Sequence, residues 1–454
     1  MTEICHSEAD SSAEESFLDK WKILFSLVLF FYFCKNCFVL YRLWLLEMKY
    51  EIKKLAWIDS IFVPMEDSNS TTMLILARAG SIYENRKNNW ISHFLEHMFF
   101  KWWKKYETPK SVAEAVDSFG WEFNAFTWDT YAGYYVKSAP DFVEKWLDVL
   151  WDMIMNARFP QDEMEREKWV VIQEVRMYED QPTALVMDKW QEFYYWDNSY
   201  WWSTLWPVEN IQWFTREDLI EHKLDLYTKD NLIIIIAWKI ANQKAVEDQI
   251  TTLFADLHEK KRIDRPEFQW ILAKQKEWKF VKWTAQNHII IWAKWFDWND
   301  ERRYAASIFS TILWWNMSSR LFQNIREKEW LCYYIRAAHH TQPHDWIFMV
   351  RAWLEKERFD YWVEKIMWEL KKISNWDISK EEFDKAIWFN VWQYQMWIES
   401  SDEMANFVWN QYLLYWEIKS LDDILAKIRN VKIDEVISVA DCLKEEKLYK
   451  YWIE

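Results

Sequence analysis

The chain has 454 residues, of which 51% are hydrophobic, and it carries a formal net charge of −16. This length allows two or three domains with sizeable cores, and the acidic balance argues against nucleic acid as a partner, because phosphate binding needs a basic surface. Five cysteines form an odd and sparse set. A disulfide framework is therefore not expected, and a reducing compartment such as the cytoplasm fits better.

Glycine and tryptophan occur in abnormal numbers. The chain has 3 glycines and 38 tryptophans, whereas a typical chain of this length has roughly thirty glycines, at about 7% usage. We hypothesise that most of these tryptophans are glycines in the native protein, because its source reads the UGA codon as glycine. Several tryptophans stand at or near expected helix ends, where a positive φ favours glycine: Trp90, Trp102, Trp103, Trp121, Trp314, Trp315 and Trp330.

Residues 1–47 form a separate N-terminal segment with two possible interpretations. Its apolar run, Ile23–Leu46, is long enough to cross a bilayer but contains Lys35 and Arg42, which are costly inside a membrane. The segment also lacks the small-residue cleavage site of a secretory signal. It is either a single membrane anchor, which would attach the protein to a membrane, or an upstream extension joined to a start at Met48.

The first strands lead into a helix that contains a histidine pair. The runs Ser60–Val63 and Thr72–Ala79 are typical of strands. His93, Glu96 and His97 then form the pattern H-x-x-E-H, the inverted form of a common zinc-protease motif. On a helix the two histidines lie one turn apart on one face, so both imidazoles can bind one metal ion. The glutamate projects beside that metal, where it can take a proton from a metal-bound water.

The rest of the first half mixes helices and strands. A helix capped by Thr108 is expected to end near Gly120. The alternating stretch Asn124–Val136 is rich in aromatic residues and threonine, which is typical of strands. Helices follow, and then the apolar strand Leu232–Ala237. The charged, proline-containing stretch His258–Glu277 is the best candidate for a linker.

The second half repeats this plan. Strands are expected at His288–Ala293, Tyr333–Ala338 and Ile347–Leu354, with helices at Asp300–Leu313 and Ser318–Glu329 and long helices after them. We therefore predict an α+β fold with helices packed against one face of each sheet. The expected division of the chain is a 1–47 extension, a 48–257 catalytic domain, a 258–277 linker and a 278–454 second domain.

A long helical run, Gln161–Asp180, carries Glu167 and Glu174 two turns apart on one face. With these residues and the H-x-x-E-H helix, the chain from about Met48 onward resembles the M16 family of zinc peptidases, which includes pitrilysin, insulin-degrading enzyme and the mitochondrial processing peptidase. The resemblance implies two related α+β domains, each a mixed, mostly antiparallel sheet, arranged as a half-clamshell. Active members of this length pair two such chains, or two halves, around an enclosed chamber.

The resemblance also implies roles for individual residues. Glu174 stands where the family has the third ligand to Zn²⁺, after His93 and His97. Glu167 matches a supporting carboxylate that orients a histidine ligand, and Glu96 would be the general base. Four further residues match substrate-binding positions, two on an edge strand and two in the second domain: Asn124, Ala125, Arg326 and Tyr333.

The expected function is zinc-dependent hydrolysis of peptides or of leader sequences by an endopeptidase. The alternative is a non-catalytic structural subunit, as some M16 relatives are, although those have typically lost the metal residues. Because one chain holds both parts of the site, we expect a homodimer in preference to a pair with a different M16 chain. His339, His340 and His344 have no matching carboxylate pattern, so a second metal site is not expected.

Overall fold

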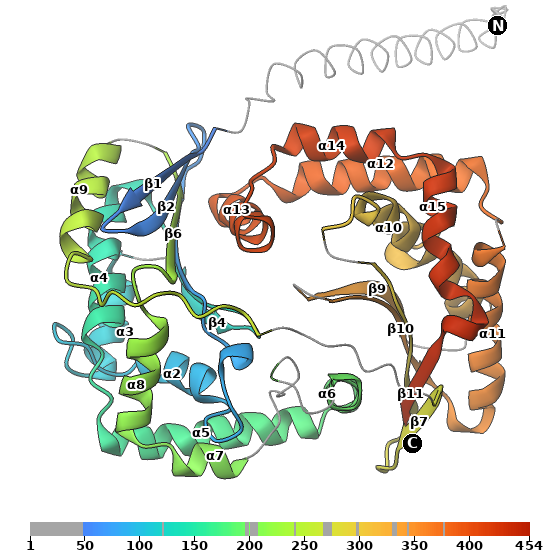
Figure 1. The fold of residues 1–454 in the computed structure, drawn as a ribbon, viewed down its shortest axis with the longest axis horizontal. Coiled ribbons are helices and arrows are strands. Elements are labelled where there is room, and N and C mark those ends of the chain that lie inside the picture. Colours follow the sequence, from blue (N-terminus) through green and yellow to red (C-terminus); the bar gives the residue numbers. More distant parts are fainter. Residues whose placement is uncertain are drawn as a thin grey trace, which may run out of the picture. The chain divides into compact units, whose positions relative to one another are not determined.

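Two β-sheets, one in each half of the chain, organise the fold (Figure 1). The computed structural model describes residues 49–119, 122–195, 199, 208–239, 242–266, 275–296, 299–328, 334–342, 345–375 and 377–454. The possible membrane segment within residues 1–47 lies outside this part of the chain. Within the described ranges, no helix has both the length and the apolar character that crossing a membrane requires.

The elements of the first half are β1 (Glu51–Leu55), β2 (Ile58–Pro64), β3 (Thr71–Ala77), α2 (Ile91–Phe99), α3 (Pro109–Phe119), β4 (Glu122–Thr127), β5 (Ala132–Ser138), α4 (Val143–Asn156), α5 (Gln161–Glu179), α6 (Pro182–Tyr195), α7 (Val208–Trp213), α8 (Arg216–Leu226), β6 (Leu232–Trp238) and α9 (Gln243–Leu253). Those of the second half are β7 (Glu277–Phe280), β8 (Asn287–Lys294), α10 (Arg303–Ser310), β9 (Ile335–Gln342), β10 (Asp345–Leu354), α11 (Phe359–Ser374), α12 (Lys380–Trp397), α13 (Ser401–Tyr415), α14 (Leu421–Asn430), α15 (Ile433–Val439) and β11 (Tyr449–Ile453).

The two sheets share one topology. The first has the order β1-β2-β6-β3-β5-β4 and the second the order β7-β11-β8-β10-β9. Without β1, the two orders match strand for strand, and each sheet has one parallel pair, β2 with β6 and β7 with β11, among antiparallel pairs. The prediction of an α+β fold with two related halves is confirmed. The domain boundaries stay a prediction, because residues 267–274 of the expected linker lie outside the described residues.

The central strands owe their positions to continuous apolar runs. Every residue of β6 is buried, as are the first seven of the eight residues of β8. A strand covered on both faces needs apolar side chains on both, so it loses the alternation that marks a half-exposed strand. The edge strand β4 instead has exposed and partly buried residues.

Helices of the same half cover one face of each sheet. A helix from the other half covers the opposite face. Helix α4 packs on β3 and β5, while α13, from the second half, packs on β3 and β6 (Figure 1). In return, α6 from the first half packs on β8 and β11. The hydroxyl of Ser401 in α13 lies 2.8 Å from those of Ser70 and Thr72, and Lys137 pairs with Asp402. The two halves are thus joined by an exchange of helices.

Two parts of the second half differ from the sequence-based expectation. The expected helices at Asp300–Leu313 and Ser318–Glu329 each become π-helical, over Thr311–Trp315 and over Phe322–Glu327. The chain also closes with the strand β11, not with a helix. This five-residue strand carries only a short alternating pattern, and its place between β7 and β8 depends on pairing over a long sequence distance.

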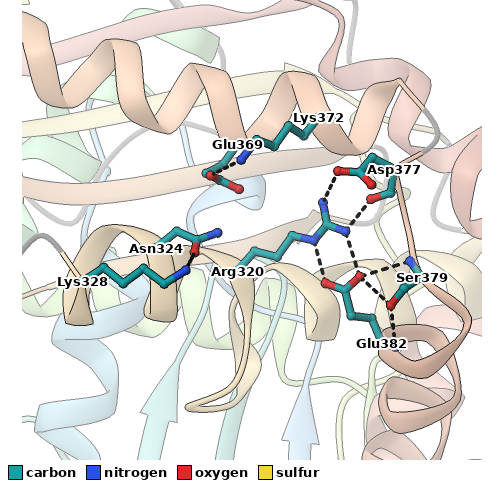
Figure 2. A network of polar contacts seen from close by, with 8 residues as sticks. All are labelled: Arg320, Asn324, Lys328, Glu369, Lys372, Asp377, Ser379 and Glu382. Atoms are coloured by element: carbon teal, nitrogen blue, oxygen red, sulfur yellow. Dashed lines mark hydrogen bonds and ion pairs between the residues drawn. The ribbon is translucent and has the colours of Figure 1, made fainter.

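A polar network joins the segment before the second π-helical turn to the start of α12 (Figure 2). Both Arg320 nitrogens Nε and Nη2 lie 2.8 Å from the carboxylate of Glu382. The same carboxylate accepts the backbone N–H of Ser379 at 3.1 Å, within the capping box of α12. Arg320 also donates to the carbonyl oxygen of Asp377. One largely buried arginine therefore fixes the N-terminus of a long helix.

The backbone bears on the hypothesis that tryptophans replace glycines. Three of the five described non-glycine residues with positive φ are tryptophans: Trp57, Trp90 and Trp416. Within the described chain, Trp102, Trp103, Trp314 and Trp315 do not have positive φ, and Trp121 and Trp330 lie outside it. Several indole N–H groups are buried without an acceptor, which is costly for genuine tryptophans; they include those of Trp238, Trp292, Trp314, Trp346 and Trp362.

Candidate metal centre

Helix α2 presents its polar residues on the face opposite its apolar one. Ile91, Phe94, Leu95, Met98 and Phe99 are buried in the core of the first half. An apolar stripe of this helical spacing fixes the rotation of the helix. The polar residues of the H-x-x-E-H pattern are consequently left on the side that lines a cavity.

The N-terminus of α2 is held by a carboxylate that the sequence did not reveal. Glu84 is buried, and it accepts the backbone N–H groups of Trp90 at 2.8 Å and Ser92 at 2.9 Å. It also accepts hydrogen bonds from the side-chain amide of Asn89, at 3.0 Å, and from the Ser92 side chain. Burial raises the pKa of Glu84 despite these hydrogen bonds. An acid several residues before a helix matches no local capping pattern, so only the fold identifies it.

The three expected ligands converge on one point. Nε2 of His93 lies 3.0 Å from Nε2 of His97, and Oε2 of Glu174 lies 3.5 Å and 3.6 Å from these two atoms. In a tetrahedral zinc site with metal–ligand distances of about 2.0–2.2 Å, ligand atoms are roughly 3.3–3.6 Å apart. No other cluster of this kind is found among the described residues. Both distances to Glu174 lie in this range, and the two imidazole nitrogens are slightly closer together, so the donor set fits Zn²⁺ after a small separation of the two rings.

The local field also suits a cation. Burial lowers the pKa of His93, but carboxylates around it, chiefly Glu174, outweigh this effect and raise the pKa overall. In turn, the hydrogen bond with His93 is the largest cause of the lowered pKa of Glu174. The negative surroundings that favour a proton on the imidazole equally favour a metal ion between these side chains.

Glu167 occupies the position of a supporting carboxylate. Its Oε1 lies 2.8 Å from Nδ1 of His97, and its Oε2 lies 2.6 Å from Nζ of Lys101. Its side chain is 7% exposed; burial raises its pKa, but the hydrogen bonds with His97 and Lys101 outweigh burial and lower it. When Glu167 accepts a hydrogen bond from Nδ1–H of His97, the lone pair of that imidazole is on Nε2, the atom that faces His93 and Glu174.

Glu96 is held by a residue of the edge strand. The hydroxyl of Thr127, the last residue of β4, donates to Oε2 of Glu96 at 2.6 Å. Glu96 lines the same cavity as His93, His97 and Glu174. Thr127 follows the expected substrate-binding residues in the same strand, but no sequence pattern assigned it a role.

The expected substrate-binding residues are placed unequally. Asn124 and Ala125 lie in β4, at the edge of the first sheet, and Ala125 lines the cavity. The backbone N–H of Ala125 donates to the Asn124 side chain at 2.9 Å. Arg326 is exposed, lies against the ring of Phe322 and is not part of the cavity lining. Tyr333 lies outside the described residues.

The ligand cluster opens into a cavity of about 1110 Å³. Its first-half wall includes His93, Glu96, His97 and Glu174, with part of β4. Residues of the second half complete the lining, among them several that were not expected from the sequence: Arg303, Tyr304, His339, Trp346, Tyr394 and Tyr415. Of the three histidines His339, His340 and His344, His339 is partly buried and stacks on Trp346, and desolvation lowers its pKa to about 4.

Two family models match the chain. Residues 64–207 match the model described as insulinase (peptidase family M16), and residues 214–389 match the one described as peptidase M16 inactive domain. The first match contains the ligand cluster and the second begins just before α8. Together the two matches cover more than half of the 454 residues.

Similar proteins and structures agree with these matches. "Uncharacterized zinc protease YmxG" of Bacillus subtilis is 28% identical, over 86% of this chain and 95% of that protein. The mitochondrial-processing peptidase subunit beta of Dictyostelium discoideum is 34% identical, over 39% of this chain and 38% of that protein. The crystal structure of a protease from Helicobacter pylori has a TM-score of 0.80 at 20% identity, over 90% of this chain and all of that one. The likeness in structure supports the fold.

Proposed function

Because the chain belongs to the M16 family of peptidases, in which its relatives are named zinc proteases, we propose that it is a zinc-dependent endopeptidase in which Glu96 is the general base. The observation that carries this proposal is the convergence of His93, His97 and Glu174 on one point, with Glu96 beside them. A structural subunit would not need a metal cluster that faces a cavity of this size.

Each residue of the proposed site has its own role. Zn²⁺ held by His93, His97 and Glu174 would supply Lewis-acid polarisation of the scissile carbonyl and would lower the pKa of water toward about 7. Glu96 takes the proton from the attacking water and gives it to the leaving amine. Thr127 holds one oxygen of Glu96 at 2.6 Å, which directs the other toward the water. Glu167 keeps His97 in the tautomer whose Nε2 binds the metal.

We propose that the peptide substrate binds along the edge strand β4. An edge strand has free backbone groups that can add an extended peptide to the sheet. The N–H of Ala125 is directed to a side chain, which a substrate carbonyl can replace. A peptide bound along β4 passes Thr127, and hence Glu96, at the end of the strand. This geometry favours extended or unfolded substrates over folded proteins.

The proposal is tested by cleavage of a mixed peptide library, with Glu96→Gln and chelator-treated protein as controls. We expect cleavage in the untreated protein, with the products detected by mass spectrometry, and none in either control. Cleavage that survives in Glu96→Gln would rule out Glu96 as the base. Zinc binding without cleavage of any peptide would contradict the endopeptidase proposal.

A further inference from the structure

The internal repeat places a counterpart of the metal helix in the second half. Helix α10 follows β8 in the chain as α2 follows β3, and these two strands hold the same position in the two sheets. Both helices line the cavity that contains the ligand cluster. Where α2 contributes the H-x-x-E-H side chains, α10 contributes Arg303, Tyr304 and Ser307. The cavity therefore has a second wall that is built like the metal centre but carries different chemistry.

Arg303 lies among phenol side chains. Its Nη2 donates to the hydroxyl of Tyr304 at 3.2 Å. Its Cζ lies 4.4 Å from the ring centroid of Tyr415 and 5.0 Å from that of Tyr304. Desolvation raises the pKa of Tyr394, and the nearby charge of Arg303 acts in the opposite direction. Rings beside the guanidinium restrict its orientation by cation–π attraction. The hydroxyls of Tyr304, Tyr394 and Tyr415 can act as further hydrogen-bond donors.

Within the described residues no carboxylate forms a close ion pair with Arg303, although the charge of Glu301 acts on it from a longer distance. Glu301, two residues before Arg303 in the sequence, forms an ion pair with Lys427 at 2.6 Å. Its carboxylate also lies 3.9 Å from the ammonium group of Lys419. Nη1 of Arg303 is buried without a hydrogen-bond acceptor. A buried donor with no acceptor costs free energy. In an arginine, such a donor is one of the two parallel N–H groups that can bind a carboxylate. Arg265 and Lys419 also line this cavity, together with the acids Asp129 and Glu417.

We propose that Arg303, with the hydroxyls of Tyr304, Tyr394 and Tyr415, binds a carboxylate group of the peptide substrate. The subsite rests on the proposed endopeptidase function and gives it a specificity. The carboxylate belongs either to an acidic side chain or to the C-terminus of the peptide, since both present the same planar anion. A peptide that runs from β4 into the cavity would be held at a second point by this subsite.

Binding to a catalytically inactive protein tests the subsite separately from catalysis. Glu96→Gln protein, both zinc-loaded and metal-free, is titrated with one extended peptide by fluorescence anisotropy. The peptide is made with Glu or Gln near its end, and with a free or an amidated C-terminus, in each combination. The same titrations are made with Arg303→Gln, with Arg303→Lys, and with Arg302→Gln as a matched control. Arg302 is the neighbouring arginine, which pairs with Asp300 and does not line the cavity.

We expect the carboxylate-bearing peptide to bind about tenfold more tightly than its neutral counterpart, a difference of about 1.4 kcal/mol. Arg303→Gln should abolish this preference, Arg303→Lys should weaken it because a lysine lacks the fork, and Arg302→Gln should keep it. If the change from Glu to Gln lowers the affinity, the bound carboxylate is that of the side chain. If amidation lowers the affinity, the bound carboxylate is that of the C-terminus. Equal binding of all peptides, or a preference that survives Arg303→Gln, would overturn the proposal. Because binding needs neither turnover nor metal, failure of the peptidase proposal would be seen separately, as absence of cleavage.

Discussion

At the scale of single residues, the contact between Glu167 and His97 decides how well the metal is held. Glu167→Gln would keep the shape of the side chain but weaken the hydrogen bond to Nδ1, and would leave Lys101 without its ion pair. We expect zinc affinity to fall about 10- to 100-fold, measured by competition with a chromophoric chelator. Glu165→Gln, an exposed change on the same helix, is the control. Equal zinc affinity in the two variants would show that Glu167 has no role at the metal.

The hydroxyl of Thr127 is the second residue-scale feature that can be tested. Thr127→Val keeps the size of the side chain and removes the 2.6 Å hydrogen bond to Glu96. We expect kcat to fall roughly tenfold, because a base that is not oriented transfers the proton less efficiently. Zinc content should not change. If kcat is unchanged, or if zinc is lost as well, the hydroxyl does not act through Glu96.

At the scale of elements, local sequence patterns correctly predicted the helices and strands that depend on contacts between neighbouring residues. The capping box of Thr215 with Asp218 at the start of α8 follows from a pattern within four residues. The helix that carries His93 and His97 and the apolar central strands were also predicted. Each follows from a pattern within a few neighbouring residues, whereas β11 and the π-helical turns depend on packing between distant parts of the chain.

The contact of Arg320 with Glu382 makes α12 sensitive to acid. The hydrogen bonds from Arg320 are the largest cause that lowers the pKa of Glu382 from its ordinary 4.5 to about 2. A lowered folded-state pKa contributes stability that is fully present above about pH 4.5 and is lost as the pH falls toward 2. Glu382→Gln should therefore lower the free energy of unfolding by about 1–2 kcal/mol at pH 7.

The measurement is urea unfolding across this pH range, with the exposed neighbour change Glu381→Gln as the control. The difference between Glu382→Gln and the unchanged protein should shrink below pH 4.5. A difference that stays constant down to pH 2 would show that the ionised carboxylate is not what stabilises the helix.

At the scale of the whole molecule, the glycine hypothesis affects many positions at once. Trp90 is the N-cap of the metal helix and has a φ of 83°, a conformation that glycine adopts freely and tryptophan rarely does. We expect peptide mass spectrometry of the native protein to find glycine at position 90, and also at Trp57 and Trp416. Tryptophan at these positions would refute the hypothesis.

The candidate site was predictable in part. The spacing of His93, Glu96 and His97 indicated a metal site by itself, whereas Glu174 and Glu167 were assigned through the family resemblance. Glu84 and Thr127 were missed because they reach α2 from other parts of the chain. The second-half wall of the cavity could not be predicted, since it forms only when the two halves pack together. The homodimer stays a prediction.

The central claim is that one zinc ion, held by His93, His97 and Glu174, is required for peptide hydrolysis with Glu96 as the base. The most direct measurement is a zinc titration of metal-free protein in which bound metal and the cleavage rate of one peptide are followed together. We expect the rate to rise in proportion to bound zinc and to stop rising at one ion per chain. Glu96→Gln should bind the same zinc without cleaving the peptide. A rate that does not depend on zinc, or full zinc binding with no cleavage, would contradict this mechanism.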